Sequence, residues 1–315
     1  MRVLTLPEGG TTVRLDVFLS RSVPGCSRRT VQHAIAAGAV RVNGRRARKG
    51  AFVGRGDRIE VADHIYAPPV LQPNTALTMP VLYEDDAVIA VDKPAGVPSH
   101  ALRADETLTV ANFLLGRHPE VRLFGRPLEG GLVHRLDTDT SGVLLAARSA
   151  VAYTALRRQF KTGQVIKQYA ALVHGDIAES GEVCVALVHR SGDRRMMQVC
   201  PHPNPGEKIR PALTRYRPLE RFGTVTLLDL RIPTGVMHQI RVHLASIGHP
   251  IVGDRLYGGD YVDDAPRQLL HADAVEFRHP VTGRPVHVRS ATPADFRAFV
   301  DSCRELRPER DGHRA

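Results

Sequence analysis

From residue 81 to residue 290, β-strand patterns follow one another with only a few helical patterns between them. The strand patterns are short apolar or alternating runs, at 81–94, 142–148, 167–173, 181–188, 212–219, 223–232, 269–277 and 286–290. Helical spacing of apolar residues occurs at 108–118, 149–160 and 238–248. A last helix is expected after Thr292-Pro293, with one apolar face made of Phe296, Phe299, Val300, Cys303 and Leu306. So many strands and so few helices predict a mixed α+β domain with a mainly antiparallel sheet.

The first 62 residues follow another pattern. Apolar residues at helical spacing predict two short helices, one around 15–19 and one capped by Ser27 and ended by Gly38. Asn43-Gly44 predicts a hairpin turn, and the alternating run at 57–61 adds a further strand. We therefore expect a small domain in which a helix pair precedes a small sheet.

The segment 63–80 contains four prolines and little charge, which favours an extended connection. The predicted organisation is thus an N-terminal domain at 1–62, a Pro-rich linker at 63–80 and a larger domain at 81–306. The remaining residues, 307–315, are polar, and we expect them to be disordered.

Positive charge is concentrated in the small domain. The whole chain has a formal net charge of +10, and residues 13–62 hold eleven Lys/Arg against three acids, or +8 of that total. A compact cationic block attracts a phosphate backbone by Coulomb force and counterion release. The alternative is a solvated surface that happens to be rich in arginine. If RNA binds here, the residues beside the second helix and the hairpin are the candidate contacts: Arg28, Arg29, Arg45, Arg46, Arg48 and Lys49.

Several classes of protein are disfavoured. No apolar run approaches the roughly 18 residues of a membrane-spanning helix. The N-terminal residues lack the apolar core of a secretory signal. The four cysteines form no CxxC pair, and neither HExxH nor a P-loop occurs. We expect a cytoplasmic protein with free thiols, no membrane partner, no metal and no cofactor.

The most distinctive segment is GLVHRLDTDTSGVLLAAR, at 131–148. A loop rich in hydroxyl and carboxylate side chains runs directly into an apolar strand. Such a loop could hold one carboxylate, Asp137 or Asp139, in a fixed orientation beside Arg135. Taken alone, the segment fits a polar turn with a local Arg–Asp pair somewhat better.

The same segment resembles the HRLD-x-x-T-S-G signature of the RluA-type pseudouridine synthases. Four further motifs of that family occur in the family's order, one before this segment, at 93–96, and three after it, at 167–169, 238–259 and 269–283. The small domain resembles an S4-type RNA-binding domain, through RLDVFLS, SRRTVQHAIAAGAVRVNG and GDRIEV. The chain departs from the family at Val236, where an arginine is usual, and at Met196, where a lysine is common.

The resemblance implies roles for individual residues. Asp137 aligns with the catalytic aspartate, and Arg241 aligns with the arginine that pairs with it. Tyr169 aligns with the tyrosine that packs on the target base, and Arg135 with the side chain that fills the gap left by a flipped-out nucleotide. Lys93 is a candidate phosphate contact. The alternatives are a helix-surface arginine at 241, a core tyrosine at 169 and an ordinary surface lysine at 93.

The implied activity is isomerisation of specific uridines in RNA to pseudouridine. This reaction transfers no electrons or phosphate overall, which agrees with the absence of cofactor motifs. Large-subunit ribosomal RNA is favoured as the substrate over transfer RNA, and we expect a monomer. One alternative is a non-catalytic RNA-binding or ribosome-assembly protein that retains the fold. Another is a glycoside hydrolase that uses Asp137 and Asp139 as its two carboxylates.

Overall fold

The computed structural model describes residues 1–6, 11–23, 26, 28–65, 69–202, 206–258 and 265–306. The chain divides into two compact units, Met1–Val70 and Leu71–Ala315. The predicted cap Ser27 and the predicted disordered tail at 307–315 lie outside the described residues. No helix in the described ranges is both long and apolar enough to cross a membrane.

The first unit combines a helix pair with small sheets. Its elements are β1 (Arg2–Leu4), β2 (Val13–Arg14), α1 (Leu15–Ser22), α2 (Arg28–Ala36), β3 (Val40–Val42), β4 (Arg45–Arg46), β5 (Phe52–Val53), β6 (Ile59–Val61) and a 3₁₀ turn, η1 (Asp63–Ile65). Four strands pair in the order β1-β6-β3-β4, and β2 pairs with β5. Asn43 and Gly44 both have positive φ, at 52° and 75°, as a two-residue hairpin turn requires. The predicted helix pair and hairpin are therefore confirmed.

The second unit is built on one large sheet. Its strands are β7 (Val81–Glu84), β8 (Val88–Lys93), β9 (Ser141–Ala147), β10 (Ile166–His174), β11 (Gly181–Cys184), β12 (Leu187–Arg190), β13 (Asp193–Val199), β14 (Leu213–Arg221), β15 (Val225–Arg231), β16 (Leu270–Arg278) and β17 (Pro285–Arg289). Its helices are α3 (Val110–Arg117), the 3₁₀ helix η2 (Pro119–Leu123), α4 (Ala150–Lys161), α5 (Gln239–Ser246) and α6 (Ala294–Glu305).

Nine of these strands form the sheet, in the order β11-β14-β15-β10-β16-β9-β8-β7, with β17 also paired to β16. Among the described pairings in this sheet, β16 with β9 is parallel and the others are antiparallel. This confirms the predicted mixed α+β fold. The strands β12 and β13 form a separate hairpin, in the segment around Met196 that matched the family only loosely.

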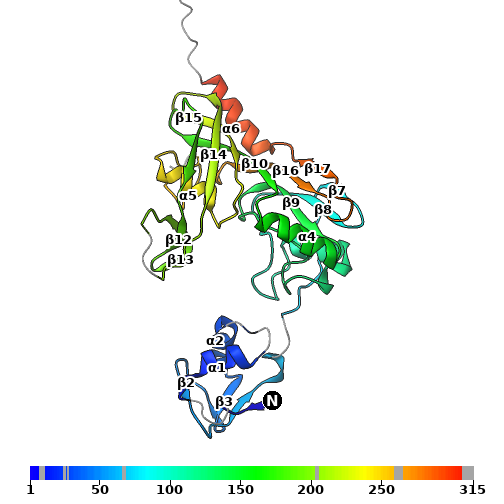
Figure 1. Cartoon of the computed structure of the whole chain (residues 1–315), viewed down its shortest axis with the longest axis vertical. Helices are drawn as coiled ribbons and strands as arrows, with labels where there is room; N and C mark the ends of the chain where they lie inside the picture. Colours follow the sequence, from blue (N-terminus) through cyan, green and yellow to red (C-terminus); the bar gives the residue numbers. More distant parts are fainter. Residues whose placement is uncertain are drawn as a thin grey trace, which may run out of the picture. The chain divides into compact units, whose positions relative to one another are not determined.

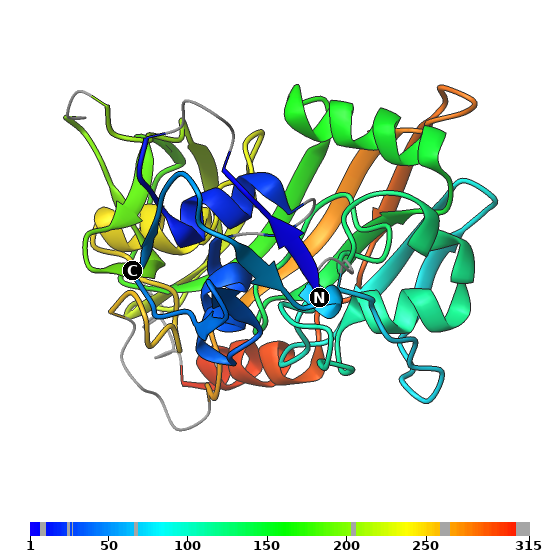
Figure 2. The same ribbon diagram turned by 90° about the horizontal axis from the view of Figure 1, so that it is seen from below.

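Alternation along the strands places a core on each face of the sheet. On β8, Val88 and Ala90 join the core that includes Leu156 of α4, whereas Ile89 and Val91 join the opposite core, which includes Leu114 of α3. Figure 2 shows β16 and β17 (orange) between α4 (green) and the segment that carries α3 (teal). The sheet is therefore covered on both faces and supplies a rigid support for its loops.

Two further helices cover the other half of the sheet (Figure 1). Ile240 and Leu244 of α5 join the same core as α3, and Phe296 and Val300 of α6 pack on Leu172 from the other face. One prediction for α6 is wrong. Leu306 does not share the packed face but is 82% exposed, and it lies at the C-cap, after the last residue of the helix.

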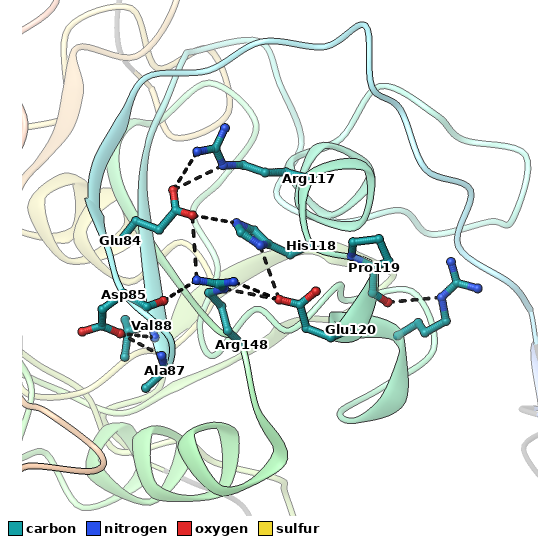
Figure 3. A network of polar contacts seen from close by, with 10 residues as sticks. Glu84, Asp85, Ala87, Val88, Arg117, His118, Pro119, Glu120 and Arg148 are labelled. Carbon is teal, nitrogen blue, oxygen red and sulfur yellow. Dashed lines mark hydrogen bonds and ion pairs between the residues drawn. The ribbon is translucent and has the colours of Figure 1, made fainter.

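A network of ion pairs ties the edge strand β7 to α3 and to the end of β9 (Figure 3). Glu84 pairs with Arg117 at 2.8 Å, and its other oxygen lies 3.3 Å from His118 Nε2. Glu120 lies 3.4 Å from His118 Nδ1 and 3.2 Å from Arg148 Nη2. Burial lowers the pKa of His118. The two arginines thus balance two carboxylates around a neutral imidazole.

The connection between the units is shorter than the predicted linker at 63–80. Leu71 and Met79 are buried in the core beneath the sheet, and Asn74 N donates to Asn112 O of α3 at 3.0 Å. The composition of this segment suggested an extended spacer, but its apolar residues find partners in the second unit.

Candidate active site

The loop that precedes β9 is fixed by backbone geometry at its end. Gly142 has φ of 111°, and a Cβ at this position would lie 2.2 Å from the carbonyl oxygen of Ala272. Only glycine therefore allows β9 to approach β16 so closely. His134 Nε2 accepts from Leu145 N at 3.0 Å, and burial lowers the pKa of His134 to about 3. The neutral imidazole anchors one side of the loop that carries Asp137.

Asp137 and Arg241 lie together although 104 positions separate them in the chain. Arg241 Nη1, from α5, donates to Asp137 Oδ2 at 3.0 Å. The Asp137 side chain is 18% exposed and the Arg241 side chain 8%. Burial opposes the charge of Arg241, but the hydrogen bonds and charge of Asp254, followed by the charge of Asp137, outweigh it and raise its pKa. The arrangement presents an oriented carboxylate next to a permanent cation.

A pocket of about 880 Å³ opens over this carboxylate. Tyr169, Arg135, Asp137 and Arg241 all line it. Tyr169 is only 7% exposed and lies on the core face of β10, and burial raises the pKa of its hydroxyl. Arg135 is exposed. The rim also carries basic side chains from the loop before β9, α4 and the loop before β14: Arg126, Arg157, Arg158, Lys161 and Arg210.

Three residues of this site were missed by the sequence analysis, one beside Asp137 and two that contact its neighbours. Asp254 is fully buried and binds Arg241 through both carboxylate oxygens, at 2.7 and 2.8 Å. His238 Nε2 lies 3.8 Å from Asp137 Oδ1, and His238 Nδ1 lies 2.7 Å from the Tyr257 hydroxyl. All three residues belong to the family motif at 238–259, so the sequence did contain a signal for them. The resemblance, however, was used to assign a role only to Arg241.

Lys93 corrects a prediction. It was expected to contact a phosphate, but its side chain is fully buried at the end of β8. Its Nζ donates to the carbonyl oxygens of Pro94, Val97 and Thr138, at 2.7–2.8 Å. Burial lowers the pKa of Lys93 to about 7, against the opposing charges of Asp139 and Asp137. Lys93 therefore ties its own loop to the residue that follows Asp137, and RNA cannot reach it.

Comparison with known proteins decides the family. A family model described as RNA pseudouridylate synthase matches residues 87–246, about half of the chain, and an S4 domain model matches residues 13–59. The chain belongs to the RNA pseudouridylate synthase family. The expected resemblance is confirmed for both domains, and the chain is an RNA-modifying isomerase by membership.

Relatives of this synthase match it over almost its whole length. Ribosomal large subunit pseudouridine synthase D of Xylella fastidiosa is 37% identical, with 96% of this chain and 93% of that protein covered. The protein of the same name from Xanthomonas campestris is 35% identical, with 97% and 93% covered. Among solved structures, human RNA pseudouridylate synthase domain containing 1 is 30% identical. Its TM-score is 0.56, with 74% of this chain and 90% of that chain covered.

The predicted RNA-binding side chains of the synthase's S4 domain are mostly exposed. Arg45, Arg48 and Lys49 lie on the surface at and after the hairpin. Arg46 is also exposed, and it donates to the carbonyl oxygen of Ala36. Arg28 is about half exposed, but it pairs with the buried Asp16 at 2.9 Å. Arg29 lies in α2, and its side chain is outside the described part of the structure.

The described residues contain no group of three or more His, Cys, Asp or Glu side chains that could hold a metal ion. His238 and His243, five positions apart, have separate partners. His243 is buried between Thr214 Oγ1 at 2.9 Å and Val185 O at 3.1 Å. Around the Asp137 carboxylate, the groups that can take part in chemistry are the guanidinium of Arg241, the imidazole of His238 and the phenol of Tyr169.

Replacing Lys93 with methionine distinguishes a structural role of this lysine from a role as a phosphate contact. We expect Lys93→Met to lower the free energy of unfolding by about 2–4 kcal/mol, because three buried carbonyl oxygens lose their donor. RNA affinity of the folded protein should stay within about twofold, since the ammonium group is not accessible. Urea denaturation and a binding titration measure the two quantities. Lys49→Met is the matched control. It should leave stability unchanged and weaken binding, and a reversed pattern would restore Lys93 as a phosphate contact.

Proposed function

We propose that this synthase converts uridine in large-subunit ribosomal RNA to pseudouridine, with Asp137 as the catalytic carboxylate. The observation that carries the proposal is the partly exposed Asp137 carboxylate, held by Arg241 at 3.0 Å in the floor of an 880 Å³ pocket. The choice of RNA is supported by the S4 domain and by the names of the relatives from Xylella and Xanthomonas.

The reaction requires little besides a well-placed carboxylate. The N1–C1′ bond breaks, the base turns, and C5 joins C1′; the proton at C5 is lost and N1 ends protonated. Asp137 acts as the nucleophile at C1′ or as the base at the sugar. Arg241 keeps it ionised and oriented by charge and hydrogen bonding. No step needs an electron or a phosphate carrier.

The aromatic and basic residues of the pocket would help the target uridine to leave the RNA stack and enter the pocket. A uridine stacked in a helix hides both C1′ and C5, so the nucleotide must turn out of the stack. Tyr169 provides an aromatic surface for the extruded base. Arg135, exposed on the loop two residues before Asp137, fills the space that the base leaves. The arginines and lysine of the rim neutralise phosphates on either side.

The decisive experiment follows the hydrogen at C5. Joining C5 to C1′ expels this hydrogen, so RNA labelled there with tritium releases the label to water. We expect release from a large-subunit ribosomal RNA transcript, and none from a transfer RNA transcript. A glycoside hydrolase would instead liberate free uracil and leave an abasic site. A non-catalytic RNA-binding protein would release neither product, and either outcome would refute the proposed reaction.

The two units have different roles, one in RNA affinity and the other in the chemical reaction. We infer that residues 1–62 mainly bind RNA and that residues 81–306 carry the reaction. The +8 charge of the segment 13–62 supports the first part. The location of every pocket residue between 100 and 270 supports the second. We also infer a monomer that acts in the cytoplasm, where ribosomal RNA is found, and that uses neither metal nor cofactor.

Neutralising the hairpin tests this division in the full-length chain. We expect Arg45→Gln, Arg48→Gln and Lys49→Gln together to weaken RNA binding and to reduce the slope of log affinity against log salt by about 2, because up to three phosphate contacts are lost. Turnover at saturating RNA should not change. The matched control removes three exposed charges of the second unit, with Arg278→Gln, Arg284→Gln and Arg297→Gln, and should leave the slope unchanged. Equal slopes for both variants would contradict a specific role of the hairpin.

A further inference from the structure

The segment Gly253–Gly258 contacts both side chains that lie beside the Asp137 carboxylate, those of Arg241 and His238. The proposed reaction assigns this segment no role. Gly253 has φ of 76°, and a Cβ there would lie 2.1 Å from the carbonyl oxygen of Arg267. This tight turn brings Asp254 beneath α5. Asp254 Oδ1 also accepts from Leu256 N at 3.0 Å, so the carboxylate is fixed by its own segment as well as by Arg241.

Asp254 determines which nitrogen of Arg241 is available. Its two oxygens accept from Arg241 Nε at 2.7 Å and from Arg241 Nη2 at 2.8 Å. The remaining nitrogen, Nη1, is the one that reaches Asp137 Oδ2. A bidentate pair fixes the plane of the guanidinium group as well as its position. Arg241 therefore points at Asp137 with an orientation that Asp254 sets.

Tyr257 lies within hydrogen-bond distance of one ring nitrogen of His238. The Tyr257 oxygen accepts from Met197 N at 3.0 Å and lies 2.7 Å from His238 Nδ1. Burial raises the pKa of Tyr257, so the phenol keeps its proton. Within the described residues, His238 Nδ1 is the acceptor available to that proton. An imidazole that accepts at Nδ1 carries its own proton at Nε2.

The other ring nitrogen of His238, Nε2, faces the Asp137 carboxylate. His238 Nε2 lies 3.8 Å from Asp137 Oδ1. Burial lowers the pKa of His238, although the charge of Asp137 opposes this effect, and the neutral ring has one donor nitrogen. The backbone of His238 is left-handed, with φ of 55°, which a residue with a Cβ adopts at a cost. This conformation at the start of α5 turns the ring toward Asp137.

We propose that Asp254 and Tyr257 are positioning residues that hold the Asp137 carboxylate from both sides. Asp254 aims Arg241 Nη1 at Oδ2, and Tyr257 aims the Nε2–H of His238 at Oδ1. The proposal rests on the proposed function, because it treats Asp137 as the reacting group. The separation of 3.8 Å is longer than a hydrogen bond, and we expect it to shorten when RNA fills the pocket.

Tyr257→Phe tests the second half of the proposal. It keeps the ring, whose centroid lies 5.1 Å from Arg241 Cζ, and removes only the hydroxyl. Ring nitrogens are observed by NMR in the full-length protein labelled with ¹⁵N-histidine, and His238→Gln assigns the signal. We expect the unmodified protein to carry the His238 proton on Nε2 and the variant to gain the Nδ1–H form. Turnover should fall about 10- to 100-fold with RNA affinity within about twofold.

Asp254→Asn tests the first half, with Leu256→Ala as the matched control in the same turn. The control should resemble the unmodified protein, because the Leu256 side chain is partly exposed and only its backbone contacts Asp254. For Asp254→Asn we expect a fall in turnover of about 10- to 100-fold per folded molecule, with KM changed by less than about twofold. A merely structural role would lower the folded fraction and reduce binding and turnover together, and that result would overturn the assignment.

The outcomes separate this proposal from the function on which it rests. Unchanged turnover in Tyr257→Phe, or a His238 proton on Nδ1 in the unmodified protein, would overturn the role of Tyr257. Unchanged turnover in Asp254→Asn would overturn the role of Asp254. A protein that releases no tritium would instead refute the proposed function, while the NMR measurement would still decide the orientation of His238.

Discussion

Asp137→Asn is expected to abolish tritium release, by about 10⁴-fold or more, while RNA affinity stays near that of the unmodified protein. The amide keeps the shape of the side chain and can still accept from Arg241 Nη1. It cannot act as a nucleophile or a base, so the loss falls on the chemical step and not on binding. Single-turnover assays with labelled RNA, together with a binding titration, measure the two effects separately.

Asp139→Asn is the matched control two residues along the same loop. Asp139 is exposed, and its backbone oxygen, not its carboxylate, accepts from Arg267 Nη1 at 3.1 Å. We therefore expect this variant to remain active. Normal turnover by Asp137→Asn would show that the catalytic assignment is wrong even though the family is right. Loss of activity in both variants would point to damage to the loop instead.

Arg241→Met should affect stability as well as turnover. The substitution leaves Asp254 buried without its cation, and breaking a buried ion pair in this way costs about 3–5 kcal/mol. Turnover of the folded fraction should fall more than RNA affinity, because the contact with Asp137 acts at the reacting group. Urea denaturation measures the first effect, and single-turnover kinetics with a binding titration measures the second.

The double variant Arg241→Met with Asp254→Asn separates the two effects. Removing the unpaired charge should recover much of the lost stability. Turnover should stay low, because Asp137 still lacks its partner. If stability is not lost in the single variant, Asp254 and Arg241 do not form the buried pair described above. If turnover and affinity fall equally, Arg241 is only an RNA contact.

Much of the fold was predictable because its signals are local. Alternating apolar residues predicted the strands of the sheet, and Asn43-Gly44 predicted the hairpin through a backbone conformation that few other residues adopt. Ser149 was expected to begin a helix, and its hydroxyl accepts from Ala152 N. In each case the deciding interaction lies within a few residues along the chain.

Other predictions failed where the outcome depended on distant partners. A lysine after a strand looks the same whether it is exposed or buried, and Lys93 is buried because two loops bring three carbonyl oxygens around its ammonium group. Leu306 continues the apolar spacing of α6, but it is the C-cap residue and its side chain is exposed. Residues 71–80 read as a spacer, yet Leu71 and Met79 are buried in the core of the second unit.

The sequence by itself determined the order of strands and helices, the separation of a basic domain from a sheet domain, and the family, through motifs whose spacing is local. Tertiary structure decided which side chains surround Asp137. Arg241 reaches it across 104 positions, and Met197 N meets the Tyr257 hydroxyl across 60. The positions of Asp254 and Tyr257 relative to that carboxylate are set by how β10, β16 and α5 pack. A chain of hydrogen bonds between such distant segments has no periodicity that a sequence could reveal.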